Sequence, residues 1–378
     1  GLGDVYKRQV LNVPPLRFPE FTKEWEEHAL AEYLDFKNGL NPDVKRIGRG
    51  LPFISVMDIL ADGTINYDSI RGKVEATERE IENFSVEKGD ILFQRSSETL
   101  EDVGRANVYM DNRTAVYGGF VIRGRKIGDY NPLFFKYLLS TPLARKRTCR
   151  MGAGAQHFNI GQDGLSKISL CFPLMEEQNK IARLLSLIDE RIATQNKIIE
   201  KLQSLIKGLR VCCMQRNGSN NVYLSEIAQI YQPQTISSAE LTEDGFLVYG
   251  ANGIIGKYKD YNHKTEQICI TCRGNTCGMV NYTKPMSWIT GNAMVINTDK
   301  YQDKVYKKYL YHYLSAYNFN SIISGSGQPQ IVRTPLEKLK ITLPTISEQK
   351  QKAMILDKVQ DKIEINHNIL NLYICLLY

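Results

Sequence analysis

Two stretches of the chain carry side chains that could hydrogen-bond to the edges of nucleic-acid bases. Arg can bind guanine in a bidentate manner, Asn and Gln can bind adenine in the same manner, and Lys or Arg neutralise phosphates. The candidates in the first half of the chain are Arg95, Ser96, Ser97, Arg105, Gln156, His157 and Asn159. Those in the second half are Arg273, Asn275, Thr276, Asn292, Gln328 and Gln330. The alternative for each residue is an ordinary solvated loop position.

A metal site is the second kind of chemistry that the residue spacing allows. Cys269 and Cys272 have the C-x-x-C spacing that begins many zinc sites, and Cys277 follows closely. The fourth ligand would be remote, either His263 or His312. In the alternative interpretation, the first two cysteines lie on a strand with small side chains and the third lies in a turn. We favour the strand and predict no metal site.

The sequence lacks the short motifs that mark common catalytic sites. There is no Gly-x-x-x-x-Gly-Lys-[Ser/Thr] loop, no Gly-x-Gly-x-x-Gly, no His-Glu-x-x-His helix and no Gly-x-Ser-x-Gly elbow. Asn12-Val13-Pro14-Pro15 and Asn131-Pro132-Leu133-Phe134 both depart from the Asn-Pro-Pro-[Tyr/Phe] motif of adenine methylases. Pro42-Asp43 is not closely followed by the [Asp/Glu]-x-Lys triplet of a metal-dependent nuclease. We therefore predict a non-catalytic chain.

Composition and charge place the chain among globular proteins. Its 378 residues, of which 43% are hydrophobic and 24% charged, suffice for two or three domains. The net charge of +7 permits a polyanion partner without demanding one. The densest basic run, Arg145-Lys146-Arg147, lies either along phosphates or on a solvated helix face.

The sequence also predicts where the protein resides. No apolar run reaches the roughly 18 residues of a membrane span, and no secretory leader opens the chain. Eight cysteines without a pairing framework suit a reducing compartment. We therefore expect a cytoplasmic protein without membrane contact. Because the chain opens Gly1-Leu2-Gly3-Asp4 without Met, we expect residues 1–14 to be a non-native or disordered leader.

The chain repeats itself at an offset of about 171 residues. Residues 165–173 resemble residues 336–344, and Glu177-Gln178 recurs as Glu348-Gln349. In each copy a globular part leads through Pro-x-x-x-Glu-Gln into a helix. The chain therefore contains two copies of one unit.

A heptad pattern predicts a long helix in each copy. The first runs from Glu176 to about Gln215, roughly 60 Å of helix, and a capping box of Thr345 and Glu348 opens the second. The predicted pairing positions are Ile181, Leu185, Ile188, Ile192, Gln195, Ile199 and Leu202 in the first helix, and Leu356, Val359, Ile363, Asn366 and Leu370 in the second. If the helices pair antiparallel, Gln195 faces Asn366, and we predict that this contact sets the register. The alternative is an ordinary core helix.

The globular parts alternate strands and helices. Predicted strands are 51–56, 91–94, 107–110 and 119–122 in the first part, and 246–249, 267–271, 279–282 and 293–297 in the second. Predicted helices are 131–140, 142–150 and 305–317. We predict an α+β fold with two similar domains, 15–172 and 217–343. Two long antiparallel coiled-coil helices, 173–216 and 344–378, separate them in a pseudo-two-fold internal repeat. The second helix is about two turns shorter, so we expect its end to be truncated or altered.

Several strings resemble those of type I restriction–modification specificity subunits. Leu16-Arg17-Phe18-Pro19-Glu20-Phe21 is similar to the opening signature of that family, and Tyr249-Gly250-Ala251-Asn252-Gly253-Ile254-Ile255-Gly256 is similar to another of its strings. The doubled helix entry and the two-copy layout extend the resemblance along the whole chain. The resemblance implies two target recognition domains held apart by antiparallel helices. Each domain would read one half of a split DNA sequence.

The same resemblance implies partners. They are double-stranded DNA, two methylation subunits docked on the helices and, in the full complex, restriction and translocation subunits. S-adenosylmethionine, ATP and Mg²⁺ are expected on the partner subunits, with no cofactor bound by this chain. Because duplex DNA repeats its grooves about every 34 Å, a rigid spacer between two reading domains can measure distance. The alternative is a coiled-coil protein-interaction scaffold without DNA specificity.

Overall fold

The computed structural model describes residues 17–154, 156–214, 220–251, 253–325 and 327–377. The predicted leader, 1–14, lies outside these residues. The chain divides into two compact units, one of Gly1–Ile192 with Leu376–Tyr378 and one of Ala193–Cys375. None of the helices formed by the described residues combines the length and the apolar character that crossing a membrane requires.

The first unit contains two four-stranded sheets. The antiparallel sheet has the order β2-β10-β6-β8, with β2 (Leu34–Asn38), β10 (Val121–Lys126), β6 (Ile91–Gln94) and β8 (Ala106–Val108). The other has the order β4-β3-β9-β5, with β4 (Lys73–Val74), β3 (Ile47–Ile54), β9 (Ala115–Tyr117) and β5 (Ser85–Val86). Two ribbons pair β1 (Glu26–Ala29) with β12 (Ser169–Phe172), and β7 (Ser96–Ser97) with β11 (Phe158–Asn159).

Short helices complete this unit. They are α2 (Val56–Ile59), α3 (Glu78–Phe84), α4 (Pro132–Ser140), α5 (Pro142–Cys149) and α6 (Gln162–Ser166). The start of α4 follows from its sequence, because the Asn131 side chain accepts hydrogen bonds from the amides of Leu133 and Phe134, and Pro132 stands where no amide donor is needed. The apolar core holds strand residues such as Phe93 and helix residues such as Phe135.

The second unit repeats this plan with fewer strands. Its antiparallel sheet has the order β14-β20-β17-β18, with β14 (Gln229–Tyr231), β20 (Ala293–Asn297), β17 (Ile268–Thr271) and β18 (Val280–Tyr282). The other sheet has the order β16-β15-β19, with β16 (Gly253–Tyr258), β15 (Phe246–Gly250) and β19 (Trp288–Ile289). A ribbon pairs β13 (Asn220–Tyr223) with β21 (Lys340–Leu343), and the helices of this part are α8 (Lys307–Ala316) and α9 (Arg333–Glu337).

Each predicted strand and helix has a counterpart in the structure, and the bounds of β6 and β20 are those predicted. One prediction was shifted. The strand expected at 119–122 begins as β10 at Val121, because the Val121 amide donates to the Gly118 carbonyl at 2.9 Å and closes a turn before the strand. Edge strands such as β2 and β14 were not predicted.

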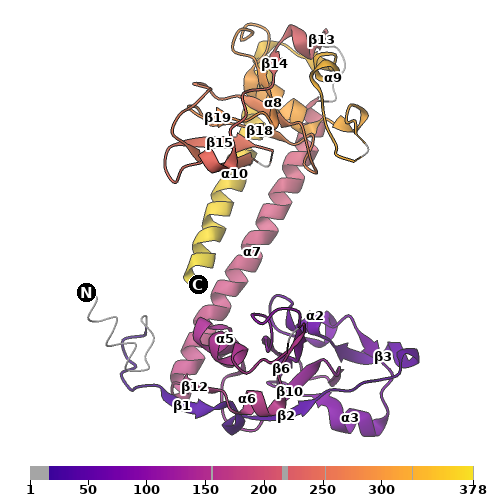
Figure 1. The fold of residues 1–378 in the computed structure, drawn as a ribbon, viewed down its shortest axis with the longest axis vertical. Helices are drawn as coiled ribbons and strands as arrows, with labels where there is room; N and C mark the ends of the chain where they lie inside the picture. The colour runs from indigo at the N-terminus through magenta and orange to yellow at the C-terminus, as the bar shows by residue number, and fades with distance from the viewer. Residues whose placement is uncertain (1–16, 155, 215–219, 252, 326, 378) are drawn as a thin grey trace. The chain divides into compact units, whose positions relative to one another are not determined.

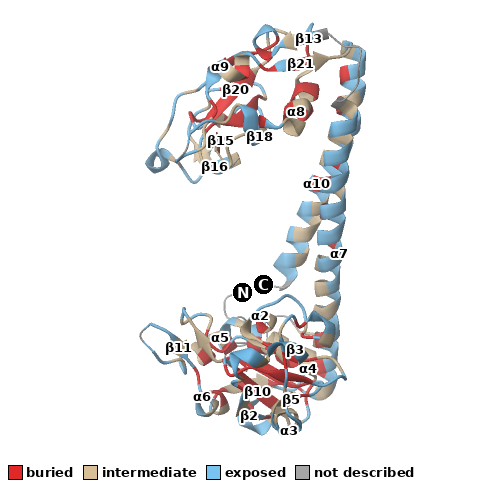
Figure 2. Cartoon of the chain, turned by 90° about the vertical axis from the view of Figure 1, so that its right-hand side faces the viewer, coloured by how far each residue is buried: buried red, intermediate tan, exposed pale blue. Residues whose placement is uncertain are grey.

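The two long helices are α7 (Met175–Met214), with 40 residues, and α10 (Ile346–Leu377), with 32. The predicted capping box is confirmed, since the Thr345 amide donates to Glu348 Oε2 at 3.0 Å and the Glu348 amide donates to Thr345 Oγ1 at 3.3 Å. Figure 2 shows that the buried residues lie mainly in the sheets, whereas most residues of both helices are exposed.

Within the second unit, α10 lies beside the carboxyl-terminal part of α7 (Figure 1). The predicted polar contact is present: Gln195 Nε2 donates to Asn366 Oδ1 at 2.5 Å and to the Asn366 carbonyl at 3.1 Å. Further along α7, Arg210 Nη2 donates to Gln360 Oε1 at 3.4 Å, so residue numbers rise on one helix as they fall on the other. The two helices therefore pair antiparallel here.

The other predicted pairing residues occupy several environments. An apolar cluster unites residues of α7 and α10: Leu202, Ile206, Leu209, Leu356, Val359 and Ile363. Ile199 is buried and Leu370 is half-buried. In the first unit, Ile181 packs against the domain core, and Leu185, Ile188 and Ile192 are half-buried.

Candidate nucleic-acid interface

Three backbone segments of the first unit meet at a polar edge, which we call the first rim: residues 95–97, 119–120 and 156–159. The Arg95 amide donates to the Phe120 carbonyl at 2.9 Å, and the Ile160 amide donates to the Arg95 carbonyl at 3.0 Å. In the β7–β11 ribbon, Ser96 lies opposite Asn159. Main-chain hydrogen bonds therefore fix this edge, whatever side chains it carries.

Several predicted side chains lie on the first rim. Ser96 Oγ donates to Asn159 Oδ1 at 2.5 Å, and Arg95 Nη1 donates to the Gly119 carbonyl at 3.3 Å. Gln156 and His157 are exposed.

Two further predicted residues have local partners. Ser97 Oγ accepts a hydrogen bond from the Thr99 amide at 3.2 Å. Arg105 lies just before β8 and forms an ion pair with Asp102 at 2.7 Å. A hydrogen bond from Thr99 Oγ1 at 2.8 Å, followed by the charge of Arg105, keeps the pKa of Asp102 below its usual range.

The second unit has an equivalent edge, which we call the second rim: residues 272–275, 291–292 and 328–330. The Cys272 amide donates to the Asn292 carbonyl at 3.0 Å, and the Ile331 amide donates to the Cys272 carbonyl at 3.0 Å. Arg273 lies opposite Gln330 in an isolated bridge. These contacts match those of the first rim residue by residue, so that Ser96 corresponds to Arg273, and Asn159 to Gln330.

A pocket of about 340 Å³ lies beside the second rim, which contributes Arg273 and Gln330 to its lining. It is lined by Tyr231, Gln232, Arg273, Met294, Gln330, Ile331, Val332 and Arg333. Asn275, Asn292 and Gln328 are exposed. The Thr276 hydroxyl donates to the Ala251 carbonyl at 3.4 Å.

A tight turn on each rim was not recognised from the sequence as a shared feature. The Ala293 amide donates to the Thr290 carbonyl at 3.0 Å, which repeats the turn closed by Val121 and Gly118. A Cβ atom on Gly119 would lie 1.8 Å from Asn41 Oδ1, and one on Gly291 would lie 2.4 Å from Thr235 Oγ1, so a larger residue in either turn would displace a neighbouring side chain. The next residue is Phe120 in one turn and Asn292 in the other, and Phe120 was missed. Aligning the two Gly-containing pairs would have found it.

Only part of the basic run of α5 is a solvated helix face. Arg145 Nη2 donates to the carbonyls of Glu101 at 2.8 Å and Val103 at 2.7 Å. Arg147 forms an ion pair with Glu27 at 2.6 Å and donates to the Ser169 carbonyl. Lys146 is exposed. The two arginines therefore hold neighbouring backbone segments, because spacing along the sequence does not reveal which carbonyls a side chain can reach.

The cysteines lie as the strand interpretation predicts. Cys269 is within β17, Cys272 follows it and Cys277 lies in a turn. Burial raises the pKa of the Cys269 thiol to about 12, and it also raises the pKa values of the Cys272 and Cys277 thiols. In the part of the chain that the structure describes, no three His, Cys, Asp or Glu side chains are grouped closely enough to hold a metal ion.

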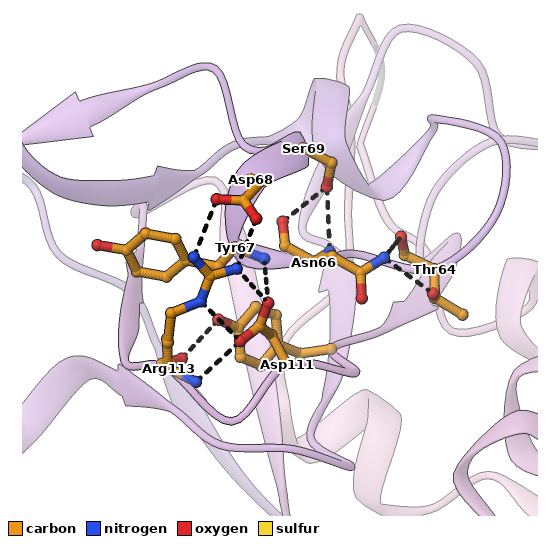
Figure 3. A network of polar contacts seen from close by, with 8 residues as sticks. Thr64, Asn66, Tyr67, Asp68, Ser69, Asp111 and Arg113 are labelled. Carbon is orange, nitrogen blue, oxygen red and sulfur yellow. Dashed lines mark hydrogen bonds and ion pairs between the residues drawn. The ribbon is translucent and has the colours of Figure 1, made fainter.

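A charged cluster in the first unit ties two loops together (Figure 3). Arg113 bonds both carboxylate oxygens of Asp68, at 3.0 and 2.7 Å, and reaches Asp111 at 2.8 Å. Its guanidinium lies 4.2 Å from the centre of the Tyr67 ring. These contacts, above all the hydrogen bonds from Arg113, lower the pKa of Asp111. Since both carboxylates are paired with Arg113, the cluster stabilises the two loops and does not leave these groups available to a ligand.

Buried glutamines join each domain to its long helix. Gln178 Oε1 accepts a hydrogen bond from the Asn131 amide at 3.0 Å, and its Nε2 donates to the Pro173 carbonyl at 3.0 Å. Gln349 Oε1 likewise accepts a hydrogen bond from the Tyr306 amide at 2.8 Å, and its Nε2 donates to the Pro344 carbonyl at 2.9 Å. The glutamine of each repeated Glu-Gln pair therefore hydrogen-bonds the backbone at the start of a helix, α4 in the first unit and α8 in the second.

Neighbouring contacts at these joints differ. Arg17 forms two hydrogen bonds with Glu177, at 2.7 and 2.6 Å, and the Glu177 side chain is only 1% exposed. In the second unit, Arg210 Nε donates to His312 Nδ1 at 3.3 Å, so the other ring nitrogen donates to Asp357 Oδ1 at 3.0 Å. His312 is fully buried, and burial lowers its pKa.

Known proteins share both the sequence and the fold. The sequence profile described as the type I restriction modification DNA specificity domain matches residues 22–204 and again residues 217–372. The chain belongs to this family. The type I restriction enzyme MjaVIII specificity subunit of Methanocaldococcus jannaschii is 26% identical over 93% of this chain and 88% of the relative. The EcoprrI specificity subunit of Escherichia coli is 32% identical over 36% of this chain and 34% of the relative.

A solved structure shares the fold of this specificity subunit. The S subunit of a type I restriction–modification system from M. genitalium aligns over 96% of both chains with a TM-score of 0.68 and 16% identity. The specificity subunit has two target recognition domains, and the profile matches place one in each half of the sequence. The predicted α+β fold with an internal repeat and two long helices is confirmed.

Proposed function

We propose that each target recognition domain reads one half of a bipartite DNA sequence through its rim. The observation that carries this proposal is the repetition of one backbone frame with different polar side chains, Ser96 and Asn159 on one rim and Arg273 and Gln330 on the other. A fixed frame with variable donors and acceptors suits recognition of two different half-sites. Arg105 and Arg273 supply positive charge for phosphates.

The long helices set the spacing between the half-sites and dock two methylation subunits. A continuous helix of 40 residues is about 60 Å long and resists bending, so it can hold a fixed distance. Exposed apolar side chains support docking, since a helix in water normally turns such residues inward: Leu184, Leu187, Leu205, Ile355, Ile365 and Leu372. Restriction and translocation subunits join the full complex in the cytoplasm.

The chain itself is non-catalytic in this proposal. The absence of catalytic motifs from its sequence supports this role, and S-adenosylmethionine, ATP and Mg²⁺ would be bound by the partner subunits. Methylation or cleavage of DNA by the purified chain alone would refute it.

Duplex binding tests the proposal against the scaffold alternative. Binding of a random-sequence duplex should weaken by about 10³-fold or more between 50 and 200 mM salt, because phosphate contacts release counterions. A scaffold that binds only protein would show little duplex binding at either salt concentration. In a host that expresses the methylation subunit, deleting the gene should abolish methylation at one bipartite adenine site, and an unchanged methylome would contradict the proposal.

A further inference from the structure

An aromatic side chain stands in solvent at the first rim. Phe120 is 68% exposed, although its backbone is tightly fixed by the turn at Gly119 and by the hydrogen bond from the Arg95 amide. An exposed apolar ring gains free energy when a partner removes it from water.

The second rim carries a polar residue at the same place. Asn292 follows the glycine of the equivalent turn, its carbonyl accepts the equivalent hydrogen bond from Cys272, and its side chain is exposed. The two domains thus present a hydrocarbon ring and an amide from matching positions. Such a difference changes which base can be contacted without altering the fold.

We propose that Phe120 and Asn292 are equivalent specificity-determining residues, which rests on the proposed function of the rims. Phe120 contacts the 5-methyl group of a thymine in one half-site, and Asn292 binds an adenine in the other. A phenyl ring has no donor or acceptor, so it distinguishes thymine by its methyl group, whereas an amide can donate to adenine N7 and accept from its N6 amino group. Ser96 and Asn159, which are hydrogen-bonded to each other on the same rim, supply polar contacts.

Selection from a random duplex library tests the proposal. The probes are the full chain, Phe120→Asn, Asn292→Phe and the control Ile127→Asn, which alters a residue that is 61% exposed just beyond the opposite end of β10. We expect the wild type and the control to select one bipartite sequence. Phe120→Asn should change preference about 10-fold at one base pair of one half-site, and Asn292→Phe should do so in the other half-site only.

Replacing the selected thymine by uracil isolates the methyl contact. Wild-type affinity should fall about fourfold, which corresponds to one methyl group, and Phe120→Asn should be insensitive to the replacement. Thermal unfolding confirms that each variant is folded.

The outcomes separate the two proposals. If the wild type selects no bipartite sequence, the proposed function fails. If it selects one, but Phe120→Asn keeps the same base preferences or weakens all sequences equally, only the inference about Phe120 fails. If Asn292→Phe also keeps the wild-type base preferences or weakens all sequences equally, the two positions are not equivalent in function.

Discussion

The two target recognition domains share a backbone frame and differ in nearly every side chain that this frame presents. In both domains, the residue that follows a central strand of the antiparallel sheet, Arg95 or Cys272, makes two main-chain hydrogen bonds on the rim. Its amide donates to the glycine turn, and its carbonyl accepts from the amide of Ile160 or Ile331. On the rims, Ser96 is replaced by Arg273, and Phe120 by Asn292. Because the frame depends on main-chain bonds, its side chains can change without loss of structure. Recognition can therefore diverge while architecture is retained.

The joints between domain and helix show the opposite balance. Gln178 and Gln349 keep the same buried hydrogen bonds, but the contacts around them are specialised. Glu177 pairs with Arg17, whereas Glu348 caps its own helix through Thr345. Each joint thus combines the shared glutamine amide with one contact that the other joint lacks, the Arg17–Glu177 pair in the first half and the Thr345–Glu348 capping box in the second. The shared contact should matter equally in both halves, and the specialised contacts should not.

The largest effect should follow removal of the anchor in the first half. Arg17→Ala leaves the Glu177 carboxylate buried without its bidentate partner and should cost about 3–5 kcal/mol. Thr345→Ala, the matched change in the second half, removes only an exposed cap and should cost about 1 kcal/mol. Urea unfolding measures both.

The two tryptophans, Trp25 and Trp288, allow this asymmetry to be located. In a Trp288→Phe background, fluorescence of Trp25 reports the first half, and Trp25→Phe leaves a reporter for the second. If Arg17→Ala and Thr345→Ala lower the free energy of unfolding equally, the two joints contribute equally to stability in spite of their different contacts.

A smaller and symmetrical effect is expected for the shared glutamines. Gln178→Leu and Gln349→Leu each leave a backbone amide and carbonyl without their partners, which should cost about 1–3 kcal/mol in either half. The measurement is the same urea titration with the two fluorescence reporters. Lys146→Leu, an exposed position on α5, serves as control and should change stability little. A cost confined to one half would break the internal symmetry.

Local patterns in the sequence predicted much of this structure. The heptad period gave both long helices and brought Gln195 to Asn366, and Thr345 with Glu348 marked a helix start, because these features depend on residues a few positions apart. Residue type alone placed Asn159 and Gln330 among the candidate base-reading residues, and both lie on the two rims.

Features that depend on distant backbone segments were not predicted. Phe120 becomes a rim residue only because Arg95 pairs with its turn and Ile160 pairs with Arg95, which no local spacing reveals. Arg145 and Arg147 resembled a solvated or phosphate-binding run, but carbonyls far along the chain were within their reach. The base contacts of the rim residues stay predictions, because they depend on where the bases of a bound duplex lie, which the sequence of this chain does not contain.

The smallest effect concerns pH and should appear in the second half alone. His312 is surrounded by Arg210, Lys308 and Asp357, and burial holds it neutral by lowering its pKa below 6.5. The unfolded chain therefore takes up a proton at this histidine that the folded chain does not, so stability should fall as pH drops below about 6.5. Burial opposes ionisation of Asp357, but hydrogen bonds from His312 and Lys308 outweigh it and lower the pKa of that carboxyl, which keeps it charged throughout this range.

Unfolding of the second half, followed through Trp288 at pH 7.5 and 5.5, measures this dependence. His312→Gln retains hydrogen-bonding capacity but cannot be protonated, so it should reduce the loss of stability between the two pH values. The first half offers a matched comparison, because its corresponding helix contact, in which Tyr137 Oη donates to Asp189 Oδ2 at 2.6 Å, contains no histidine. If His312→Gln and the wild type lose the same stability on acidification, the buried histidine is not the pH-sensitive element that distinguishes the two joints.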